Sequence, residues 1–252
     1  MTSADGRWVM AYNGEVYNAE DLRPDFPDTE WRGHSDTEVV LEGIAHDGVE
    51  ATVSKLIGMF AMAIWDAQEQ CLYLVRDRLG IKPLYWCWAG DTFIFGSEVK
   101  ALERHPDFTA SLDPKAIHAF LRHAYVPAPH SVYEGVFKLE PGCILRVPNS
   151  DSTEQSRYWD MSQVARDGIA ARRATDDLQA TDELEALLSD AVRRRMVADV
   201  PLGAFLSGGI DSSTVVALMG THADRPVKTF SIGFDVEGYD EATHARAVAE
   251  HL

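Results

Sequence analysis

The sequence predicts two different folds in succession: an α+β domain of layered antiparallel sheets, then an α/β domain with a parallel sheet. Three observations lead to this prediction. Residues 1–150 carry short apolar runs separated by turn residues, with few helical patterns between them. Residues 151–177 are polar and irregular, which indicates a linker, with room for a short ordered stretch near Tyr158-Trp159. Over 178–252, helical and strand-like patterns alternate, as they do in parallel sheets with crossover helices.

The strands of the first domain are expected at residues 7–12, 15–17, 59–65, 71–75, 84–88 and 92–95. Asn13-Gly14 lies between the first two, and this dipeptide is the strongest short signal for a hairpin turn. Ser35 and Glu38 have the spacing of a capping box, which predicts a helix over 36–45. Ion pairs are expected around a turn at Gly80, formed by Arg76, Asp77, Arg78 and Lys82.

The second domain is expected to contain a helix from about Asp182, a strand over 200–206, a helix over 210–219, a strand over 227–234 and a helix over 240–252. Gly220 is placed to end the second of these helices. A basic cluster, Arg193, Arg194 and Arg195, lies at the end of the first helix, where positive charge suits the helix dipole.

The composition excludes several classes of function. Acidic residues number 40 and basic residues 23, a net charge of −17, so nucleic acid is not expected as a partner. No apolar run approaches the roughly 20 residues of a membrane-spanning helix, so no membrane association is expected. Cys71, Cys87 and Cys143 are far apart and lack metal-binding spacing, which indicates a reducing compartment and a cytoplasmic protein.

The most specific functional signal is the stretch Ser207-Gly208-Gly209-Ile210-Asp211-Ser212-Ser213. It follows a predicted strand and opens a helix, so backbone N–H groups at the helix N-terminus can face an anion. The paired glycines let a ligand approach the backbone, and the serine hydroxyls add donors for phosphate oxygens. Asp211 beside phosphates requires a bridging cation, which predicts Mg²⁺ with pyrophosphate. The structural alternative is a turn whose Asp and Ser cap the next helix.

This stretch resembles the pyrophosphate loop of the N-type ATP pyrophosphatases, and residues 200–213 resemble the asparagine synthetase branch of that superfamily. Residues 229–235 and 239–242 are similar to the same branch. The resemblance implies that Leu206 and Ile232 contact the adenosine of ATP, although both are equally explained as core residues. It implies an ATP site made of Leu206, Ser207, Gly208, Gly209, Asp211, Ser212, Ser213 and Ile232, with Mg²⁺ at Asp211.

The first domain resembles the class II, or N-terminal-nucleophile, glutamine amidotransferase domain of the same family. The matching segments are residues 12–18, 21–23, 34–38, 58–66, 76–85, 95–100, 125–129 and 138–142. Nearly the whole chain is covered by the resemblance. The implied organisation is a partial glutaminase domain over 1–150, a linker over 151–177 and a partial ATP pyrophosphatase domain over 178–252.

Glutamine binding is assigned to Asn13, Gly14, Glu15 and Asp36. Amide hydrolysis needs donors directed at the developing oxyanion, and the Asn13 side-chain amide and Gly14 N–H on one tight turn can supply two. A hairpin turn also explains this dipeptide, and both interpretations can hold. Asp36 can bind the α-ammonium of glutamine, or it can be a helix-start acid favoured by the macrodipole. The resemblance alone assigns Glu15 to the pocket.

The family's nucleophile is an N-terminal cysteine, and this position departs from the pattern. Thr2 follows Met1 here, and although Thr2 is in principle an N-terminal nucleophile, only eleven residues precede Tyr12, where the family has several strands. The last residues, 247–252, stop inside a helical pattern. We therefore expect a fragment cut at both ends, without glutaminase or synthetase activity by itself.

The resemblance implies a glutamine-dependent asparagine synthetase as the parent protein. Glutamine hydrolysis supplies ammonia, ATP adenylates the aspartate side-chain carboxylate with release of pyrophosphate, and ammonia displaces AMP to give asparagine. ATP and Mg²⁺ are the expected cofactors, the partners are small molecules, and a homodimer is left open. One alternative is a family member that acts on another acceptor: a cell-surface polysaccharide amidotransferase or a relative of β-lactam synthetase. The other is a non-catalytic remnant.

Overall fold

The structure is a computed structural model that describes residues 1–148, 152–198, 200–234 and 240–252. The chain divides into two compact units, Met1–Ala171 and Arg172–Leu252. Three residues discussed above lie outside the described part: Asp151 at the start of the expected linker, and Asp235 and Tyr239 in the segments that carry the resemblance. Among the described residues, no helix has the length and apolar character needed to cross a membrane.

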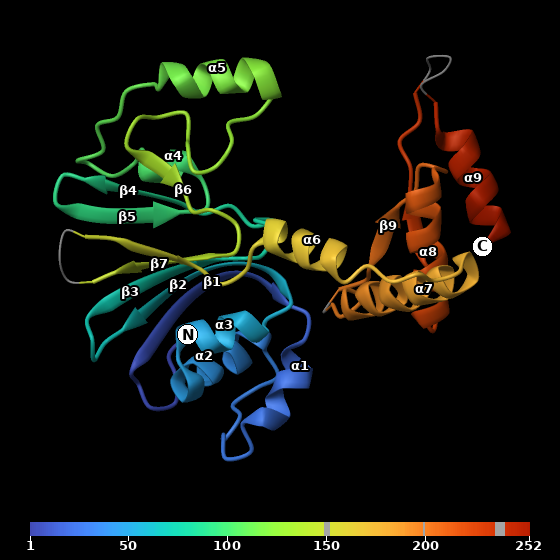
Figure 1. Cartoon of the computed structure of the whole chain (residues 1–252), viewed down its shortest axis with the longest axis horizontal. Helices are drawn as coiled ribbons and strands as arrows, with labels where there is room; N and C mark the ends of the chain where they lie inside the picture. The colour runs from blue at the N-terminus through green and yellow to red at the C-terminus, as the bar shows by residue number, and fades with distance from the viewer. Residues whose placement is uncertain (149–151, 199, 235–239) are drawn as a thin grey trace. The chain divides into compact units, whose positions relative to one another are not determined.

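The first unit contains two antiparallel sheets, which confirms the expected architecture (Figure 1). The larger sheet has the order β1-β2-β3-β7-β8, with β1 (Trp8–Val16), β2 (Gly58–Asp66), β3 (Cys71–Arg76), β7 (Cys143–Val147) and β8 (Glu154–Arg157). The smaller sheet has the order β5-β4-β6, with β4 (Tyr85–Ala89), β5 (Thr92–Gly96) and β6 (Val136–Lys138). The four apolar runs between 59 and 95 thus form β2, β3, β4 and β5, as expected.

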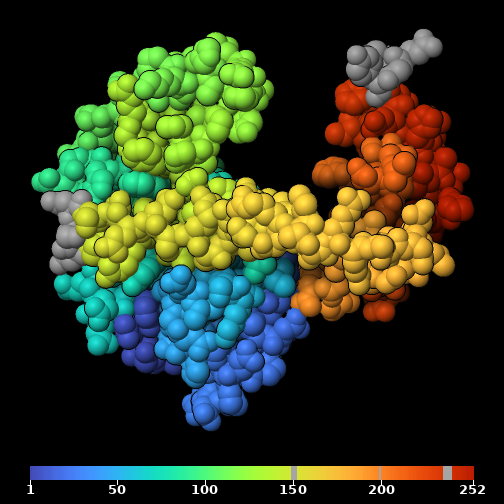
Figure 2. Space-filling model, viewed as in Figure 1, coloured from blue at the N-terminus to red at the C-terminus, as the bar shows by residue number. Residues whose placement is uncertain are grey.

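Helices cover the outer faces of these sheets. The short α1 (Ala19–Leu22) and η1 (Arg23–Asp25) precede α2 (Asp36–Asp47) and α3 (Val49–Lys55), which lie against the larger sheet (Figure 1). Beyond the smaller sheet lie α4 (Val99–Leu102) and α5 (Pro114–His123). Figure 2 shows α5 at the surface, in green, and its apolar residues Ile117, Phe120 and Leu121 are exposed.

The core has two layers because the larger sheet is covered on both faces. Side chains of α2, α3 and β2 that are fully buried form the first layer: Leu41, Ile44, Val53, Phe60, Met62 and Ile64. The second layer lies between the sheets and contains Ala61, Ala63, Leu74, Leu84 and Leu139, with Trp86, Trp88 and Phe93 packed against it. Burial on both faces explains why β2 reads as a continuous apolar run instead of an alternating one.

The expected hairpin turn at Asn13-Gly14 is wrong. A single strand, β1, runs through both residues, and Gly14 lies opposite Phe60 of β2. A Cβ atom on Gly14 would lie 2.2 Å from the Met59 carbonyl oxygen. Glycine is therefore required here for close contact between two strands, a tertiary constraint that overrides the local turn preference of Asn-Gly.

The segment expected to be an irregular linker is also different from the expectation. Its described residues form β8 and the helix α6 (Met161–Ala170). All residues of β8 are exposed, so no apolar alternation marks this strand in the sequence. It is held by its ladder with β7 and by the N–H groups of Tyr158 and Trp159, which donate to the Gly142 oxygen at 2.9 and 3.2 Å.

The second unit has the predicted helix and strand alternation. Its elements are α7 (Asp177–Arg194), β9 (Gly203–Phe205), α8 (Ile210–His222), β10 (Lys228–Phe230) and α9 (Ala242–His251). β9 and β10 pair in parallel, as expected, with Leu206, Val216 and Ala245 forming the buried cluster beside them. The expected start of the first helix near Asp182 is wrong, because Asp176 caps α7 by accepting from the Gln179 N–H. Gly220 lies inside α8 and does not end it.

Candidate functional site

The open edge of β1 is where the first group of predicted residues meets. Gly14 lies opposite Phe60, whose N–H and carbonyl both face the other way, toward Asp77 at 3.2 and 2.9 Å. Opposed residues in an antiparallel pair exchange both hydrogen bonds or neither. Gly14 therefore turns its N–H to the side of β1 that faces away from β2. Thr2 pairs with Val9 on this side, and among the described residues no strand pairs there alongside Gly14. An amide in this position is available to a ligand.

Asp36 is bound to the same edge. It is the first residue of α2, and its Oδ2 accepts the Val16 N–H at 2.8 Å and the Tyr12 hydroxyl at 2.7 Å. Val16 is two residues beyond Gly14, so its N–H points to the same side of the strand. The structure thus brings the Asp36 carboxylate and the Gly14 amide to one strand edge. The sequence gives no indication that Asp36 contacts Tyr12 and Val16 of β1.

Asn13 and Glu15 lie on the other face of β1. Both side chains are exposed, as the alternation of the strand requires. The Asn13 amide nitrogen donates to the Ser97 hydroxyl at 3.3 Å, and Ser97 directly follows β5 of the smaller sheet. The Asn13 amide therefore lies on the face of β1 that meets Ser97, whereas the Gly14 N–H lies at the edge of the strand. Sequence reasoning did not assign Ser97 or Tyr12 to the site, although alternation along β1 would have placed Tyr12 on the Asp36 face.

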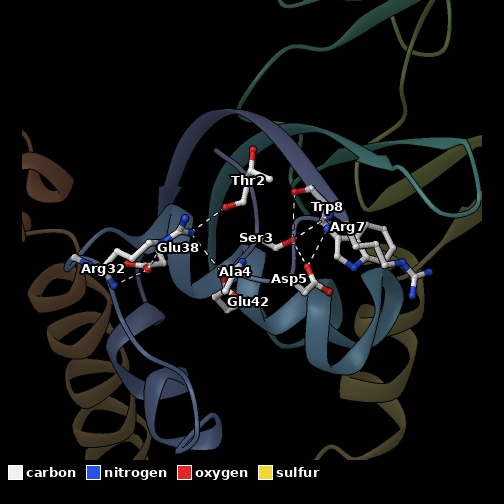
Figure 3. Close-up of polar contacts among 10 residues, drawn as sticks. Thr2, Ser3, Ala4, Asp5, Arg7, Trp8, Arg32, Glu38 and Glu42 are labelled. Atoms are coloured by element: carbon white, nitrogen blue, oxygen red, sulfur yellow. Dashed lines mark hydrogen bonds and ion pairs between the residues drawn. The ribbon is translucent and has the colours of Figure 1, made fainter.

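A buried acidic pair on α2 supports the segment that leads into Asp36 (Figure 3). Glu38 accepts the Arg32 N–H at 2.8 Å and the Gly33 N–H at 2.9 Å, one on each carboxylate oxygen. Glu42 accepts the Ala4 N–H at 2.9 Å, and the Arg32 guanidinium bridges both acids. Burial alone would raise the pKa of Glu38, but the hydrogen bonds and the charge of Arg32 hold that pKa below its usual value.

The capping box predicted from Ser35 and Glu38 is half correct. Ser35 is the N-cap of α2 and accepts the Thr37 N–H at 3.1 Å. Glu38 does not return to the N-cap as the motif requires, because its two oxygens are used by Arg32 and Gly33 further upstream. The side chain that local spacing assigns to a helix cap instead fixes the loop before the helix.

The charged cluster around Gly80 stabilises the turn, but through hydrogen bonds to the backbone instead of the expected ion pairs. The Arg76 guanidinium donates to three carbonyl oxygens, those of Gly80, Lys82 and Leu139. The Asp77 carboxylate is fully buried and accepts four backbone N–H groups, from Phe60, Leu79, Ile81 and Lys82. The recorded hydrogen bonds of both side chains are thus made to backbone groups, most of them in the turn.

The three cysteines are all buried and unpaired. Burial raises the pKa of the Cys87 and Cys143 thiols. A thiol of this kind is a poor nucleophile, because the reactive form is the thiolate. Cys71, the third, is fully buried. The structure therefore offers no internal cysteine suited to attack an amide.

The loop between β9 and α8 has the geometry of an anion cradle. Gly208 has φ +83°, and a Cβ there would lie 2.7 Å from the His244 Cβ of α9. The Ser207 and Gly209 N–H groups donate to loop hydroxyls, each at 3.3 Å. Among the described residues, no partner is recorded for the N–H groups at positions 208, 210, 211 and 212. These unpaired amides include the first turn of α8, which has no side-chain cap.

A pocket of about 340 Å³ opens beside this loop. Four residues assigned to ATP from the sequence line it: Leu206, Ser207, Ser212 and Ile232. Leu206 is buried and Ile232 is 68% exposed, so the core explanation fits Leu206 and does not fit Ile232. Asp211 is exposed at the first turn of α8, and within the described part of the chain its carboxylate has no hydrogen-bond or ion-pair partner. Gly209 and Ser213 complete the loop through the Ser213 hydroxyl, which donates to the Gly209 oxygen at 2.7 Å.

Comparison with known proteins matches two successive segments of the chain to two family models. The family model described as a glutamine amidotransferase domain matches residues 1–159, and the one described as asparagine synthase matches residues 183–252. A Methanocaldococcus jannaschii protein, provisionally named a glutamine-hydrolyzing asparagine synthetase, is 36% identical over 249 residues, or 97% of this chain and 46% of that protein. The Bacillus subtilis glutamine-hydrolyzing asparagine synthetase 3 is 35% identical over 239 residues, or 90% of this chain and 37% of that protein.

The chain thus spans less than half the length of these relatives. Among solved structures, the Bacillus subtilis glutamine phosphoribosylpyrophosphate amidotransferase with ADP and GMP has a TM-score of 0.44 at 17% identity, covering 95% of this chain and 49% of that one. A match at that level adds nothing to the assignment. Because the first family model covers more than half of the 252 residues, the chain belongs to the glutamine amidotransferase domain family and continues, over residues 183–252, into a segment of the asparagine synthase family.

Proposed function

We propose that this chain is part of a glutamine-dependent asparagine synthetase, an ATP-dependent carbon–nitrogen ligase. In this reaction, glutamine and water give glutamate and ammonia in the first unit. In the second, the aspartate side-chain carboxylate attacks the α-phosphorus of ATP and releases pyrophosphate. Ammonia then attacks the activated carbonyl and AMP leaves, so that asparagine is formed. The names of the relatives support this reaction, and the order of the two matched segments agrees with it.

The observation that carries the proposal is the loop between β9 and α8. Unpaired amides at the start of a helix are suited to phosphate oxygens, because they are donors without protein acceptors and lie at the positive end of the helix dipole. The pocket beside them is lined by both the loop serines and Leu206 and Ile232. A capping turn would instead tie these amides to side chains, and only the Ser207 and Gly209 amides are bound in that way.

Mg²⁺ fits this loop as a partner of the nucleotide. The ion is commonly held by one or two carboxylates together with waters and substrate phosphates. Asp211 supplies one exposed, unpaired carboxylate directly at the amides that would face pyrophosphate. Among the described residues no cluster of three or more His, Cys, Asp or Glu could hold a metal without the nucleotide. We therefore assign Asp211 to the metal in the nucleotide complex, where the ion would offset phosphate charge.

In the first unit we assign the oxyanion donors to Asn13 and Gly14, and the α-ammonium to Asp36. The open edge of β1 supports this, since Gly14 directs its amide there and Asp36 is bound two residues away. Glu15 remains a proposed pocket residue on the Asn13 face. The three cysteines are buried, and Thr2 stands apart from the N-terminal cysteine of the family pattern, so we expect the chain taken alone to release no ammonia from glutamine.

Ammonia release tests that expectation directly. Purified protein is incubated with glutamine, and ammonia is measured by a coupled dehydrogenase assay beside an Asn13→Ala variant. Equal, background rates are expected for both. A rate clearly above the Asn13→Ala variant would contradict the proposal that no nucleophile is present.

Nucleotide binding tests the second unit. Isothermal titration with ATP and Mg²⁺ is expected to show binding by the wild type and at least severalfold weaker binding by Asp211→Asn. Asp224→Asn is the matched control, because Asp224 is an exposed aspartate of the same unit that does not line the pocket. Binding that is unchanged in Asp211→Asn, or equal with and without Mg²⁺, would contradict the metal assignment. Absence of ATP binding to the wild type would contradict the nucleotide site in this chain.

The acceptor rests on the names of the relatives, since no described residue is assigned to aspartate. A polysaccharide or β-lactam-type acceptor would use the same loop and the same ammonia donor. The three unpaired cysteines agree with a cytoplasmic location. Association into a homodimer is a prediction that sedimentation velocity would test.

A further inference from the structure

The two oxygens of the Asp36 carboxylate are held in different ways. Oδ2 is bound by β1, through the Tyr12 hydroxyl at 2.7 Å and the Val16 N–H at 2.8 Å. Within the described part of the chain, Oδ1 is bound from the adjacent residue and the N-cap: the Thr37 N–H at 2.6 Å, the Thr37 hydroxyl at 3.2 Å and the Ser35 hydroxyl at 3.5 Å. One oxygen is therefore anchored to the sheet, and the other faces only the start of its own helix.

Tyr12 is a rigid and permanently protonated donor. Its ring packs against the buried cluster formed by α2, α3 and the larger sheet, so the position of the hydroxyl is fixed by the core. Burial raises the pKa of Tyr12 far above its ordinary value, and the hydrogen bond to Asp36 raises it further. The protonated phenol therefore serves as a hydrogen-bond donor to Asp36.

We propose that Tyr12 is a positioning residue, which anchors Oδ2 of Asp36 together with the Val16 amide and leaves Oδ1 to receive the α-ammonium of glutamine. This inference rests on the proposed function, because it takes Asp36 as the ammonium ligand. Tyr12 itself does not touch the substrate. Its effect is on the orientation of the carboxylate, which without it would be held by the Val16 and Thr37 amides alone.

The choice of Oδ1 follows from the donors. Both acceptor positions of Oδ2 are taken by groups that belong to the rigid sheet and its core. On Oδ1 the Thr37 N–H occupies one acceptor position at 2.6 Å. The Thr37 and Ser35 hydroxyls, at 3.2 and 3.5 Å, make only long and weak bonds to the rest of this oxygen. An ammonium ion is a stronger donor than a neutral hydroxyl and can displace them. A carboxylate fixed at one oxygen presents the other in a constant direction, which is what a selective ion pair requires.

A competing arrangement makes the opposite prediction. If the ammonium bound at Oδ2, the Tyr12 hydroxyl would have to leave, and the tyrosine would oppose binding. Removing the hydroxyl would then increase the affinity for glutamine. The sign of the effect of Tyr12→Phe therefore distinguishes the two arrangements.

The experiment is a titration followed by nitrogen-15 NMR, with two ligands and three proteins. The ligands are glutamine and 4-carbamoylbutanoate, which is glutamine without its α-amino group. The proteins are the wild type, Tyr12→Phe and Tyr133→Phe. Tyr133 is the matched control, because its hydroxyl also donates to a carboxylate, that of Glu103 at 2.9 Å, but in another part of the unit.

We expect Tyr12→Phe to bind glutamine about fivefold more weakly, the effect of one ordinary hydrogen bond. Its affinity for 4-carbamoylbutanoate should equal that of the wild type, since this ligand has no ammonium. A purely structural role of Tyr12 would weaken both ligands alike. Tyr133→Phe should bind both as the wild type does. Exchange of the Val16 amide proton, measured without ligand, should be faster in Tyr12→Phe because its acceptor is less well held.

The possible results separate this inference from the proposed function. If the wild type binds glutamine but Tyr12→Phe binds it equally well or more tightly, the positioning role is refuted and the glutamine site stands. Parallel losses for both ligands also refute it. If the wild type does not bind glutamine, the proposed glutamine site is refuted for this chain, and the inference is refuted with it.

Discussion

Replacement of Asp77 by asparagine tests whether the buried carboxylate holds the turn after β3 and, through it, β2. The carboxylate has no exposed surface and accepts four backbone N–H groups. Oδ1 accepts those of Leu79 and Ile81 at 3.1 and 2.9 Å. Oδ2 accepts those of Phe60 and Lys82 at 3.2 and 2.9 Å. Asparagine has the same shape, so the change removes acceptors without leaving a cavity.

The expected loss follows from counting donors. Asparagine keeps one carbonyl oxygen and replaces the other with an NH₂ group. In either orientation of the amide, two backbone N–H groups lose their acceptor and face another donor. A buried donor without an acceptor costs about 1–3 kcal/mol, so the expected destabilisation is about 2–6 kcal/mol. Since a domain is stable by roughly 5–15 kcal/mol, this is a large part of the total.

Tryptophan fluorescence in urea measures this loss in the first unit alone. All six tryptophans lie in Met1–Ala171, so their emission does not follow unfolding of the second unit. The change in midpoint, at an unchanged slope, gives the change in the free energy of unfolding. Asp107→Asn is the control, because Asp107 is exposed and its carboxylate accepts no recorded hydrogen bond from the described residues. A loss for Asp77→Asn smaller than about 1 kcal/mol, the cost of a single unpaired donor, would refute the reasoning.

Two further changes test the loop and the acidic pair. Gly208→Ala places a Cβ 2.7–2.9 Å from atoms of His244 and Ala245, at a residue with φ +83°. Amide hydrogen exchange in α9 should therefore accelerate, and the affinity for ATP should fall. Gly220→Ala is the control, since its Cβ meets nothing within 4 Å and the change should stabilise α8 by about 1 kcal/mol. Exchange that is equally slow in α9 of both variants would contradict the packing argument. Glu38→Gln removes a carboxylate whose folded pKa is lowered, so its contribution to stability is complete above the unfolded pKa of about 4.3 and is lost as pH falls through the folded value. Urea midpoints of wild type and Glu38→Gln should therefore differ at pH 7 and converge on acidification, and a constant difference would contradict the assigned role.

Much of the fold was predictable because its cause is local. The apolar runs at 59–65 and 71–75 match the observed bounds of β2 and β3 closely, since these strands are buried and long enough to be recognised. Strand β8 was not predictable, because its residues are all exposed and only pairing with β7 defines it. The start of α7 was placed too late because its first turns carry few apolar residues, and the Asp176 cap defines the helix instead.

For the candidate site, the sequence could suggest residues but not their geometry. The sequence identified Asn13, Gly14 and Asp36, yet the contact of Asp36 with β1 depends on a pairing between elements 20 residues apart in sequence. Glu38 was assigned to a cap because the motif is short and does not specify where the glutamate points. The strand–loop–helix order around residues 206–209 was predicted more accurately, since a strand, a glycine pair and a helix in sequence constrain one another's geometry.

The incorrect hairpin at Asn13-Gly14 bears directly on the proposed oxyanion role. Donors stabilise a developing charge effectively only when they are held in place before the reaction, because reorganisation in the transition state would cost what the hydrogen bonds gain. The tip of a hairpin is held only through the two strands that lead into it. Gly14 instead lies within a strand and packs closely against Met59 and Phe60 of β2. Phe60 is in turn fixed by Asp77, and Val16 on the same edge is fixed by Asp36. The strand edge is therefore a more rigid frame for the amide than the expected turn, and the correction to the fold favours the proposed chemistry.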